Sequence, residues 1–440
     1  PVAAAPAAAP AAASAVAVPA AAEQPKKNEP RKEKKKKTPP AALLPNETIT
    51  EGSVSIEYEC RSGDTAGKGT AANDGPVFYN KVQVFNRDLS VLVISLFAQW
   101  RYIEKEELKA KKAGNKTGEA GAGMIAAEAK RKELYGLSAI QLDARLRETA
   151  STDGIEILDA LAATGLRSIR YAKEVPGVKC VVSNDFEVDA TAAAERNISQ
   201  NGAADVCTAQ NADALLAMIE SKAGGRRGSQ YDVIDLDPYG SAAPFVDGAV
   251  QALADGGLLC VTSTDMAVLS GNYPEVCYAK YGSMPIKSRF LHENALRILL
   301  HTLEAAATKY KRHIVPVLSL SIDFYIRVFV RVFERPQEVK QTASKRGFIL
   351  QSGGCPTFYV QPVSRPENRA DGHGPAFLHH GNARKQRGAT PAARRKDRKK
   401  AEQDEDAGVE DDAAEQLTGD AKQRAEGMKV QDVANAGKAE

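Results

Sequence analysis

The chain has 440 residues, enough for two or three domains at about 100–200 residues per domain. Its hydrophobic content of 43% and charged content of 26% are typical of a globular chain, and no apolar run is long enough to cross a membrane. The six cysteines are scattered singly, without a Cys-x-x-Cys pair, which argues against a disulfide framework and a complete structural zinc site. A reducing, intracellular compartment is therefore the expected location.

The net charge of +3 conceals two strongly charged ends. Residues 1–46 are rich in Ala and Pro and then in Lys, and residues 381–440 contain almost no large apolar side chains. Such a composition cannot bury enough apolar surface to offset chain entropy, so we expect two disordered arms. The Lys-rich block at 26–37 fits a nuclear-import signal or a phosphate-binding arm. The nucleus is therefore the expected compartment, with the mitochondrion as the alternative.

The middle of the chain predicts an α/β domain. A segment rich in Gly, Ala and Asn at 113–123 predicts a surface loop between two helices. From residue 154 onwards, short apolar runs alternate with amphipathic stretches. The predicted strands are 155–161, 180–183, 206–209, 232–236 and 257–263, and the predicted helices are 168–174, 188–201 and 243–253. This alternation predicts a parallel, doubly wound, Rossmann-like sheet that binds its ligand outside the carboxyl ends of the strands.

Acidic residues are predicted at three successive strand ends. Asp159 precedes a small-residue turn into a helix, Asp185 ends the second strand, and Asp213 follows the third. Asp185, at the end of the second strand, can accept hydrogen bonds from both hydroxyls of a ribose, and Asp213 can accept one from the exocyclic amine of adenine. The sequence has neither Gly-x-Gly-x-x-Gly nor Gly-Lys-Ser/Thr here, which argues against a dinucleotide or a nucleoside triphosphate. The acids predict a pocket for a nucleoside that carries a positive charge.

The segment 235–240, Asp-Leu-Asp-Pro-Tyr-Gly, gives the sharpest chemical signal. The preceding strand brings Asp237 to the sheet edge, Pro238 fixes the backbone direction, and Tyr239 offers a flat ring. This pattern is typical of enzymes that methylate exocyclic amines of bases. Because an aryl amine is a poor nucleophile, the site must hold it with the carboxylate and the Pro238 carbonyl while the ring stacks on the base. Asp235 shares a strand face with Asp237, and either a catalytic or a purely structural role fits it.

This segment is one of a series of motifs in a fixed order. They occupy residues 76–80, 85–88, 158–167, 184–185, 235–241, 263–265, 277–282, 292–293 and 321–328. In sequence and order they resemble the tRNA (guanine-26-N2)-dimethyltransferase family over about residues 76–333. The resemblance implies S-adenosylmethionine as the methyl donor and guanosine-26 of tRNA as the substrate, converted to the monomethyl and then the dimethyl form.

The resemblance also implies roles for individual residues. Phe78 and Tyr239 fall where the family holds the target guanine between two rings, and Asp237 falls where it holds the N2 amine. We assign catalytic roles to these three residues and Pro238, and expect Asp237 to accept the released proton. The expected cofactor-binding residues, with Asp159 added from its strand-end position, are Arg87, Asp159, Arg167, Asp185, Asp213 and Ala214.

Residues beyond about 335 depart from the family pattern. The resemblance implies a smaller RNA-binding domain there, often with two cysteine pairs suited to zinc. Ser352 stands where the first pair would begin, Cys355 remains, and no second pair follows. Because a thiolate-rich tetrahedral site needs four soft ligands, we predict no zinc and no other metal.

The expected organisation has four parts. Residues 47–335 form a methyltransferase domain with an N-terminal extension, 336–380 a divergent or truncated α+β remnant of the tRNA-binding domain, and 1–46 and 381–440 the disordered arms. The expected partner is tRNA, with no membrane contact, and the sequence leaves protein partners unknown. The basic residues available for tRNA phosphates, besides the arms, are Lys280, Lys287, Arg289, Lys309, Lys311, Arg312, Lys345 and Arg346.

Two alternatives stay open on sequence alone. One is an amino methyltransferase that acts on a different RNA or DNA base, and the motifs at 78 and 86–88 argue against it. The other is a catalytically idle tRNA-binding protein that kept the fold. The intact segment at 237–239 argues against this second alternative, whereas the altered C-terminal region leaves it open.

Overall fold

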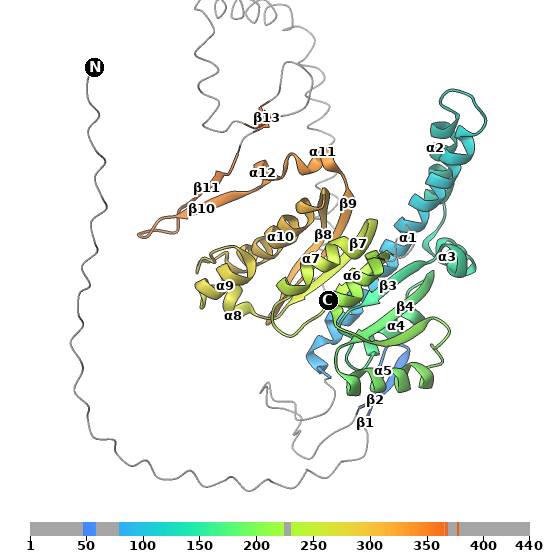
Figure 1. Ribbon diagram of the computed structural model, residues 1–440, viewed down its shortest axis with the longest axis horizontal. Coiled ribbons are helices and arrows are strands. Elements are labelled where there is room, and N and C mark those ends of the chain that lie inside the picture. Colours follow the sequence, from blue (N-terminus) through green and yellow to red (C-terminus); the bar gives the residue numbers. More distant parts are fainter. Residues whose placement is uncertain (1–46, 59–78, 224–229, 365, 368–375, 378–440) are drawn as a thin grey trace, which may run out of the picture.

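A central β-sheet organises the molecule, for which the computed structural model describes residues 47–58, 79–223, 230–364, 366–367 and 376–377. The sheet has seven strands in the order β5-β4-β3-β6-β7-β9-β8 (Figure 1). The five strands β5, β4, β3, β6 and β7 run parallel. Strand β9 pairs antiparallel with β7, and β8 pairs antiparallel with β9. The strands are β3 (Ile155–Asp159), β4 (Val178–Asp185), β5 (Cys207–Asn211), β6 (Tyr231–Leu236), β7 (Leu253–Ser263), β8 (Arg312–Ile322) and β9 (Tyr325–Glu334).

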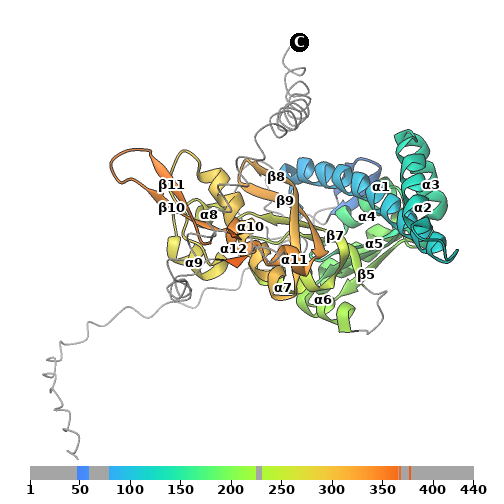
Figure 2. The same ribbon diagram turned by 90° about the horizontal axis from the view of Figure 1, so that it is seen from above.

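Helices cover both faces of the sheet because its central strands are apolar on both sides. Along β3, Ile157 belongs to one buried core and Leu158 to the other. The core that contains Ile157 includes residues of α1, α4 and α5, and the core that contains Leu158 includes residues of α6, α7 and α10 (Figure 2). These helices are α1 (Val84–Asn115), α4 (Leu166–Glu174), α5 (Val188–Gln200), α6 (Ala214–Ala223), α7 (Ala243–Ala252) and α10 (Leu291–Lys309).

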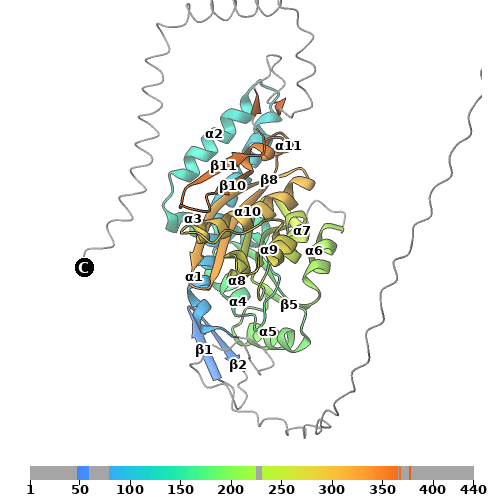
Figure 3. The same ribbon diagram turned by 90° about the vertical axis from the view of Figure 1, so that its left-hand side faces the viewer.

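The N-terminal part consists of a hairpin and three helices. Strands β1 (Glu47–Glu51) and β2 (Val54–Tyr58) pair antiparallel, and Val54 and Ile56 enter the core shared by α4 and α5 (Figure 3). A short η1 helix (Lys81–Gln83) leads into α1, which extends beyond the sheet and pairs with α2 (Ala122–Tyr135) (Figure 1). Helix α3 (Ala139–Asp153) starts with a capping box between Ser138 and Gln141.

Small elements surround the C-terminal half of the sheet. Helices α8 (Met266–Leu269) and α9 (Pro274–Tyr281) follow β7 and precede α10. After β9 come α11 (Pro336–Val339), α12 (Thr342–Lys345) and the antiparallel hairpin of β10 (Gly347–Gln351) and β11 (Phe358–Pro362). The two-residue strands β12 (Pro366–Glu367) and β13 (Ala376–Phe377) pair with each other.

The predicted α/β class and its parallel sheet are confirmed. The predicted loop at 113–123 contains the turn between α1 and α2, and the strand predicted at 155–161 ends at Asp159 because the next residues form the turn into α4. The antiparallel strands β8 and β9 were not predicted. In the ranges that the structure describes, no helix is both long and apolar enough to cross a membrane. Phe78 and the arms at 1–46 and 381–440 lie outside the described residues.

Candidate active site

The turn after β3 forms the centre of the sheet's carboxyl edge. Asp159 is almost fully buried, 1% exposed, and its Oδ2 accepts from the Ser168 hydroxyl at 2.7 Å. Ala163 and Gly165 both have positive φ, 48° and 75°. Asp159 therefore supports the inside of the turn. Its predicted contact with a ligand stays a prediction.

The next two strand ends hold the turn in place. Asn184, fully buried in β4, donates through Nδ2 to the backbone oxygens of Ala160 at 3.0 Å and Ala212 at 3.1 Å. Asp185 accepts from the backbone N–H of Ala163 at 2.8 Å through Oδ2 and from that of Glu187 at 3.0 Å through Oδ1. The turns after β3, β4 and β5 thus form one connected edge.

Asp213 combines a capping role with an exposed position. Its Oδ1 accepts from the backbone N–H groups of Leu215 at 2.7 Å and Leu216 at 3.3 Å at the start of α6. Ala214 is buried at the same helix start. Asp185 is half-buried, and the ring of the next residue, Phe186, is 66% exposed. Carboxylates and an apolar ring therefore lie together at one edge, as a nucleoside site requires.

Strand β6 brings the 235–240 segment to the same edge. Asp237 is half-buried, Pro238 is buried, and the ring of Tyr239 is 69% exposed. Gly240 has φ 75° and exchanges two hydrogen bonds with Thr264, both 2.8 Å long. This exchange anchors the loop to the end of β7 and leaves the Tyr239 ring accessible for stacking.

A buried polar network lies behind Asp237. Asp235 and Arg327 form a two-pronged ion pair, Nη1 to Oδ1 and Nη2 to Oδ2, both 2.8 Å, with both side chains fully buried. Arg167 donates to Asp235 Oδ2 at 3.3 Å and also to Asp237 Oδ2. The Ser90 hydroxyl oxygen accepts from Arg167 at 3.2 Å and from Arg327 at 2.9 Å. The network connects Asp237 to α1, α4 and β9.

This network moves two carboxyl pKa values in opposite directions. Burial by itself would raise the pKa of Asp235, but Arg327 and then Arg167 outweigh it and hold that pKa at about 2. Burial and then the Asp235 carboxylate raise the pKa of Asp159 to about 7. Asp235 is therefore ionised at neutral pH, whereas Asp159 carries a proton for much of the time.

Arg87 lies in a separate cluster at the N-terminal hairpin. Its Nε donates to Glu51 Oε2 at 2.7 Å and its Nη2 to Glu51 Oε1 at 2.5 Å. Tyr79 donates to the same carboxylate at 2.8 Å, and the Arg87 guanidinium lies over the Tyr79 ring at 5.3 Å from its centre. Burial and then the hydrogen bond to Glu51 raise the pKa of Tyr79 to about 12. Arg87 here joins the hairpin to α1.

The structure thus brings Asp185, Asp213 and Ala214 to one edge, joins Arg167 to Asp237, and leaves Arg87 on Glu51. Sequence reasoning missed the partners of these residues and of Asp235, namely Glu51, Ser90, Tyr171 and Arg327. The available signal was Arg327 itself, an arginine between the apolar residues Ile326 and Val328, because a buried charge requires a partner.

Comparison with known proteins shows to which family the chain belongs. The model of the family described as N2,N2-dimethylguanosine tRNA methyltransferase matches residues 57–407. The chain belongs to this family. The mouse tRNA (guanine(26)-N(2))-dimethyltransferase is 45% identical over 326 residues, which are 73% of this chain and 46% of that protein. The human enzyme of the same name is 43% identical over 332 residues, 73% of this chain and 48% of its own length. The chain spans about half the length of these curated relatives.

A solved structure of the same family supports the fold. It is the complex of Trm1 from Pyrococcus horikoshii with S-adenosyl-L-methionine, 25% identical, with a TM-score of 0.53. The match covers 76% of this chain and 73% of that one. Among the described residues, no group of three or more His, Cys, Asp and Glu side chains is arranged to hold a metal ion.

Proposed function

We propose that the chain is an S-adenosylmethionine-dependent methyltransferase that modifies the exocyclic N2 of guanosine-26 in tRNA, first once and then twice. The observation that carries the proposal is the half-buried Asp237 beside the exposed Tyr239 ring, at the same sheet edge as Asp185 and Asp213. Membership of the dimethylguanosine tRNA methyltransferase family supports the substrate.

The residues at the edge fit the cofactor. Each carboxylate oxygen of Asp185 accepts one backbone N–H and has a further lone pair for a ribose hydroxyl. Asp213 uses Oδ1 for the cap of α6, which leaves Oδ2 for an adenine amine. Phe186 offers an apolar surface beside them. When bound, the cofactor supplies an electrophilic methyl group on a positively charged sulfur. We assign its binding to Asp185, Asp213 and Ala214, with Arg87, Asp159 and Arg167 as further candidates.

The remaining residues act on the base. The guanine leaves its stack, which costs a few kcal/mol, and stacks on Tyr239, with Phe78 as the proposed second ring. Asp237, oriented through Oδ2 by Arg167, accepts a hydrogen bond from the N2 amine with Oδ1. The Pro238 carbonyl accepts the second N2 hydrogen, and Asp237 receives the proton that the amine releases. Correct orientation supplies much of the acceleration, and a positioned proton acceptor adds about 10²–10⁴-fold.

We also propose the division of the chain. Residues 47–335 hold the catalytic unit, and 336–380 are a remnant of a tRNA-binding domain. In support, the β10–β11 hairpin is largely exposed and contributes little to the two cores. We place the protein inside the cell, in the nucleus. A relative from Saccharomyces cerevisiae is named as mitochondrial, which keeps the mitochondrion as the competing compartment.

Incubation with labelled S-adenosylmethionine and unmodified tRNA, followed by nucleoside analysis, tests the function. The wild-type chain is expected to label guanosine-26, and Asp237→Ala to lose at least about 100-fold in rate while it still binds tRNA. Tyr239→Phe is the matched control, since it keeps the ring. A label on another base would favour a different amino methyltransferase. Binding of tRNA without any label would favour an idle tRNA-binding protein.

A further inference from the structure

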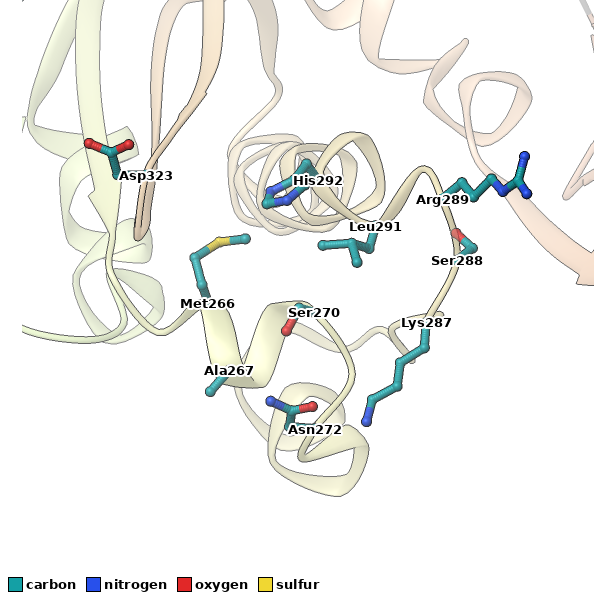
Figure 4. A pocket seen from close by; sticks show the side chains of 10 residues that line it. All are labelled: Met266, Ala267, Ser270, Asn272, Lys287, Ser288, Arg289, Leu291, His292 and Asp323. Atoms are coloured by element: carbon teal, nitrogen blue, oxygen red, sulfur yellow. The ribbon is translucent and has the colours of Figure 1, made fainter.

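A cavity of about 770 Å³ lies beside the catalytic loop and has no role in the site described above. Its walls come from α8, from the segment before α10, and from the turn between β8 and β9. Figure 4 shows Met266, Leu291 and His292 pointing toward one another across it, while Lys287 and Arg289 extend from its rim. Its volume is within the range of small-molecule sites, so a nucleotide fits.

The cavity is connected to the target-base loop by a short piece of backbone. Thr264 exchanges hydrogen bonds with Gly240 of the loop, and Met266, two residues later, already lines the cavity. Two residues of chain span at most about 7 Å. An RNA strand whose target base stacks on Tyr239 can therefore reach this cavity with a neighbouring nucleotide.

The charges at the rim suit a phosphate. Lys287 and Arg289 are both exposed, and among the described residues neither has a carboxylate within ion-pair distance. Nearby Lys280, by contrast, pairs with Asp265 at 3.2 Å. The opposing charge is Asp323, on the far side of the cavity in the β8–β9 turn (Figure 4). The cationic side of the rim is thus available for an anion.

Exposed aromatic rings accompany these cations. Tyr273, 53% exposed, follows a lining residue at the start of α9, and Phe324, 41% exposed, follows Asp323. Interleaved cations and exposed rings are the pattern with which proteins bind unpaired nucleic-acid strands, because cations contact phosphates and rings stack on bases. A protein partner would also cover apolar surface. The unpaired cations favour RNA.

We propose that this cavity is a substrate subsite that binds the RNA backbone next to the target guanosine, with Lys287 and Arg289 on phosphates of that backbone. The inference rests on the proposed function for its substrate. It adds a binding site to the edge formed by Asp237 and Tyr239, and it gives the chain a contact to tRNA that does not depend on the altered region beyond residue 335.

Charge reversal tests the subsite in the full chain. Lys287→Glu and Arg289→Glu are each expected to weaken tRNA binding roughly tenfold at 0.15 M salt and to raise KM for tRNA in parallel. Each is also expected to lower the slope of log K against log salt by about one. The rate at saturating tRNA and the affinity for S-adenosylmethionine should stay within twofold of wild type. Arg147→Glu on α3, an exposed arginine at the other end of the molecule, is the matched control and should change tRNA affinity less than twofold.

The outcomes separate this inference from the proposed function. If the wild-type chain binds tRNA but transfers no methyl group, the function fails while the binding measurements still decide the subsite. Wild-type affinity and salt slope in both variants would overturn the subsite, and so would equal losses in Arg147→Glu. If Lys287→Glu and Arg289→Glu keep the tRNA affinity of wild type but no longer bind a protein that the wild-type chain binds, the cavity belongs to a protein partner instead. Lys287→Gln and Arg289→Gln, which remove charge without adding any, should give smaller losses in the same direction.

Discussion

Arg327 and Asp235 face each other across the centre of the sheet, joined by two hydrogen bonds of 2.8 Å, and neither side chain is exposed to solvent. Asp235 lies on β6, two residues before Asp237, and Arg167 contacts both carboxylates. The ion pair is therefore part of the support of the proposed catalytic residue. Its energetic importance can be measured separately from activity.

Arg327→Met is expected to destabilise the fold by about 3–5 kcal/mol, because it leaves Asp235 with one buried guanidinium instead of two. Asp235→Asn should cost a similar amount, and the double variant should cost less than the sum. Urea unfolding measures all three. Arg331→Met on the same strand is the control. Its partner Glu104 is 41% exposed, so the expected loss is about 1 kcal/mol. Additive losses in the double variant would mean that the two residues do not act as a pair.

Tyr239→Ala is expected to lower kcat/KM for tRNA without lowering stability. The ring is 69% exposed, so its removal leaves no cavity in the core. Stacking on a base is worth about 1–3 kcal/mol, which corresponds to a loss of about 5- to 150-fold. Tyr239→Phe should stay close to wild type. Equal activity of the Ala and Phe variants would remove Tyr239 from the base-binding site.

Local patterns in the sequence were sufficient for the parallel part of the fold. The central strands β3 and β6 are short, mainly apolar runs that are largely buried, and the sequence shows them as such. Asp185 ends β4, and Asp213 comes two residues after the edge strand β5. Their common position at one sheet edge then follows from parallel topology alone. The positive φ of Gly165 accompanies a turn that the small residues already indicated.

Long-range pairings could not be predicted in this way. Asp235 and Arg327 are 92 residues apart, and Arg87 and Glu51 are 36 apart, so no local periodicity connects them. Strand β9 lies next to β7 although three helices (α8, α9 and α10) and β8 intervene in the chain, and the strand–helix alternation does not predict this connection. The contact of Arg167 with Asp237 is also of this kind, since the two residues are 70 positions apart, and the predicted contact of Arg167 with the cofactor stays a prediction.

Asp159 predicts a specific pH dependence of stability. Its pKa rises from 3.8 to about 7 on folding, so between about pH 4 and 7 the folded state binds a proton that the unfolded state has released. Stability from this group is therefore present below pH 4 and is lost as pH rises toward 7. Asp159→Asn removes this dependence and keeps an acceptor for Ser168.

The difference in unfolding free energy, Asp159→Asn minus wild type, should consequently increase from pH 4 to 7 and level off above. Urea unfolding at a series of pH values measures it. Asp235→Asn should show the opposite dependence at lower pH, because the Asp235 pKa falls from 3.8 to about 2 on folding and its contribution is lost as pH drops through that range. A difference for Asp159→Asn that does not vary with pH would contradict the raised pKa.

Gly165 is expected to resist substitution for two separable reasons. Its φ of 75° disfavours any side chain, by about 1–3 kcal/mol, and a Cβ built on it would lie 2.9 Å from the Ala194 Cβ of α5. Gly202 has a similar φ of 61° and nothing within 4 Å of its Cβ position. Gly202→Ala therefore measures the backbone cost alone, and Gly165→Ala should lower the unfolding free energy further because the turn and α5 must move apart.

Combining Gly165→Ala with Ala194→Gly should recover part of that further loss. The new glycine inside α5 costs about 1 kcal/mol by itself, and this cost is subtracted before the comparison. Equal losses of unfolding free energy in Gly165→Ala and Gly202→Ala would show that the contact with α5 does not constrain the turn. A larger loss in Gly165→Ala that Ala194→Gly partly restores would show that α5 fixes the turn after β3. Asp185 accepts a hydrogen bond from the Ala163 N–H of this turn.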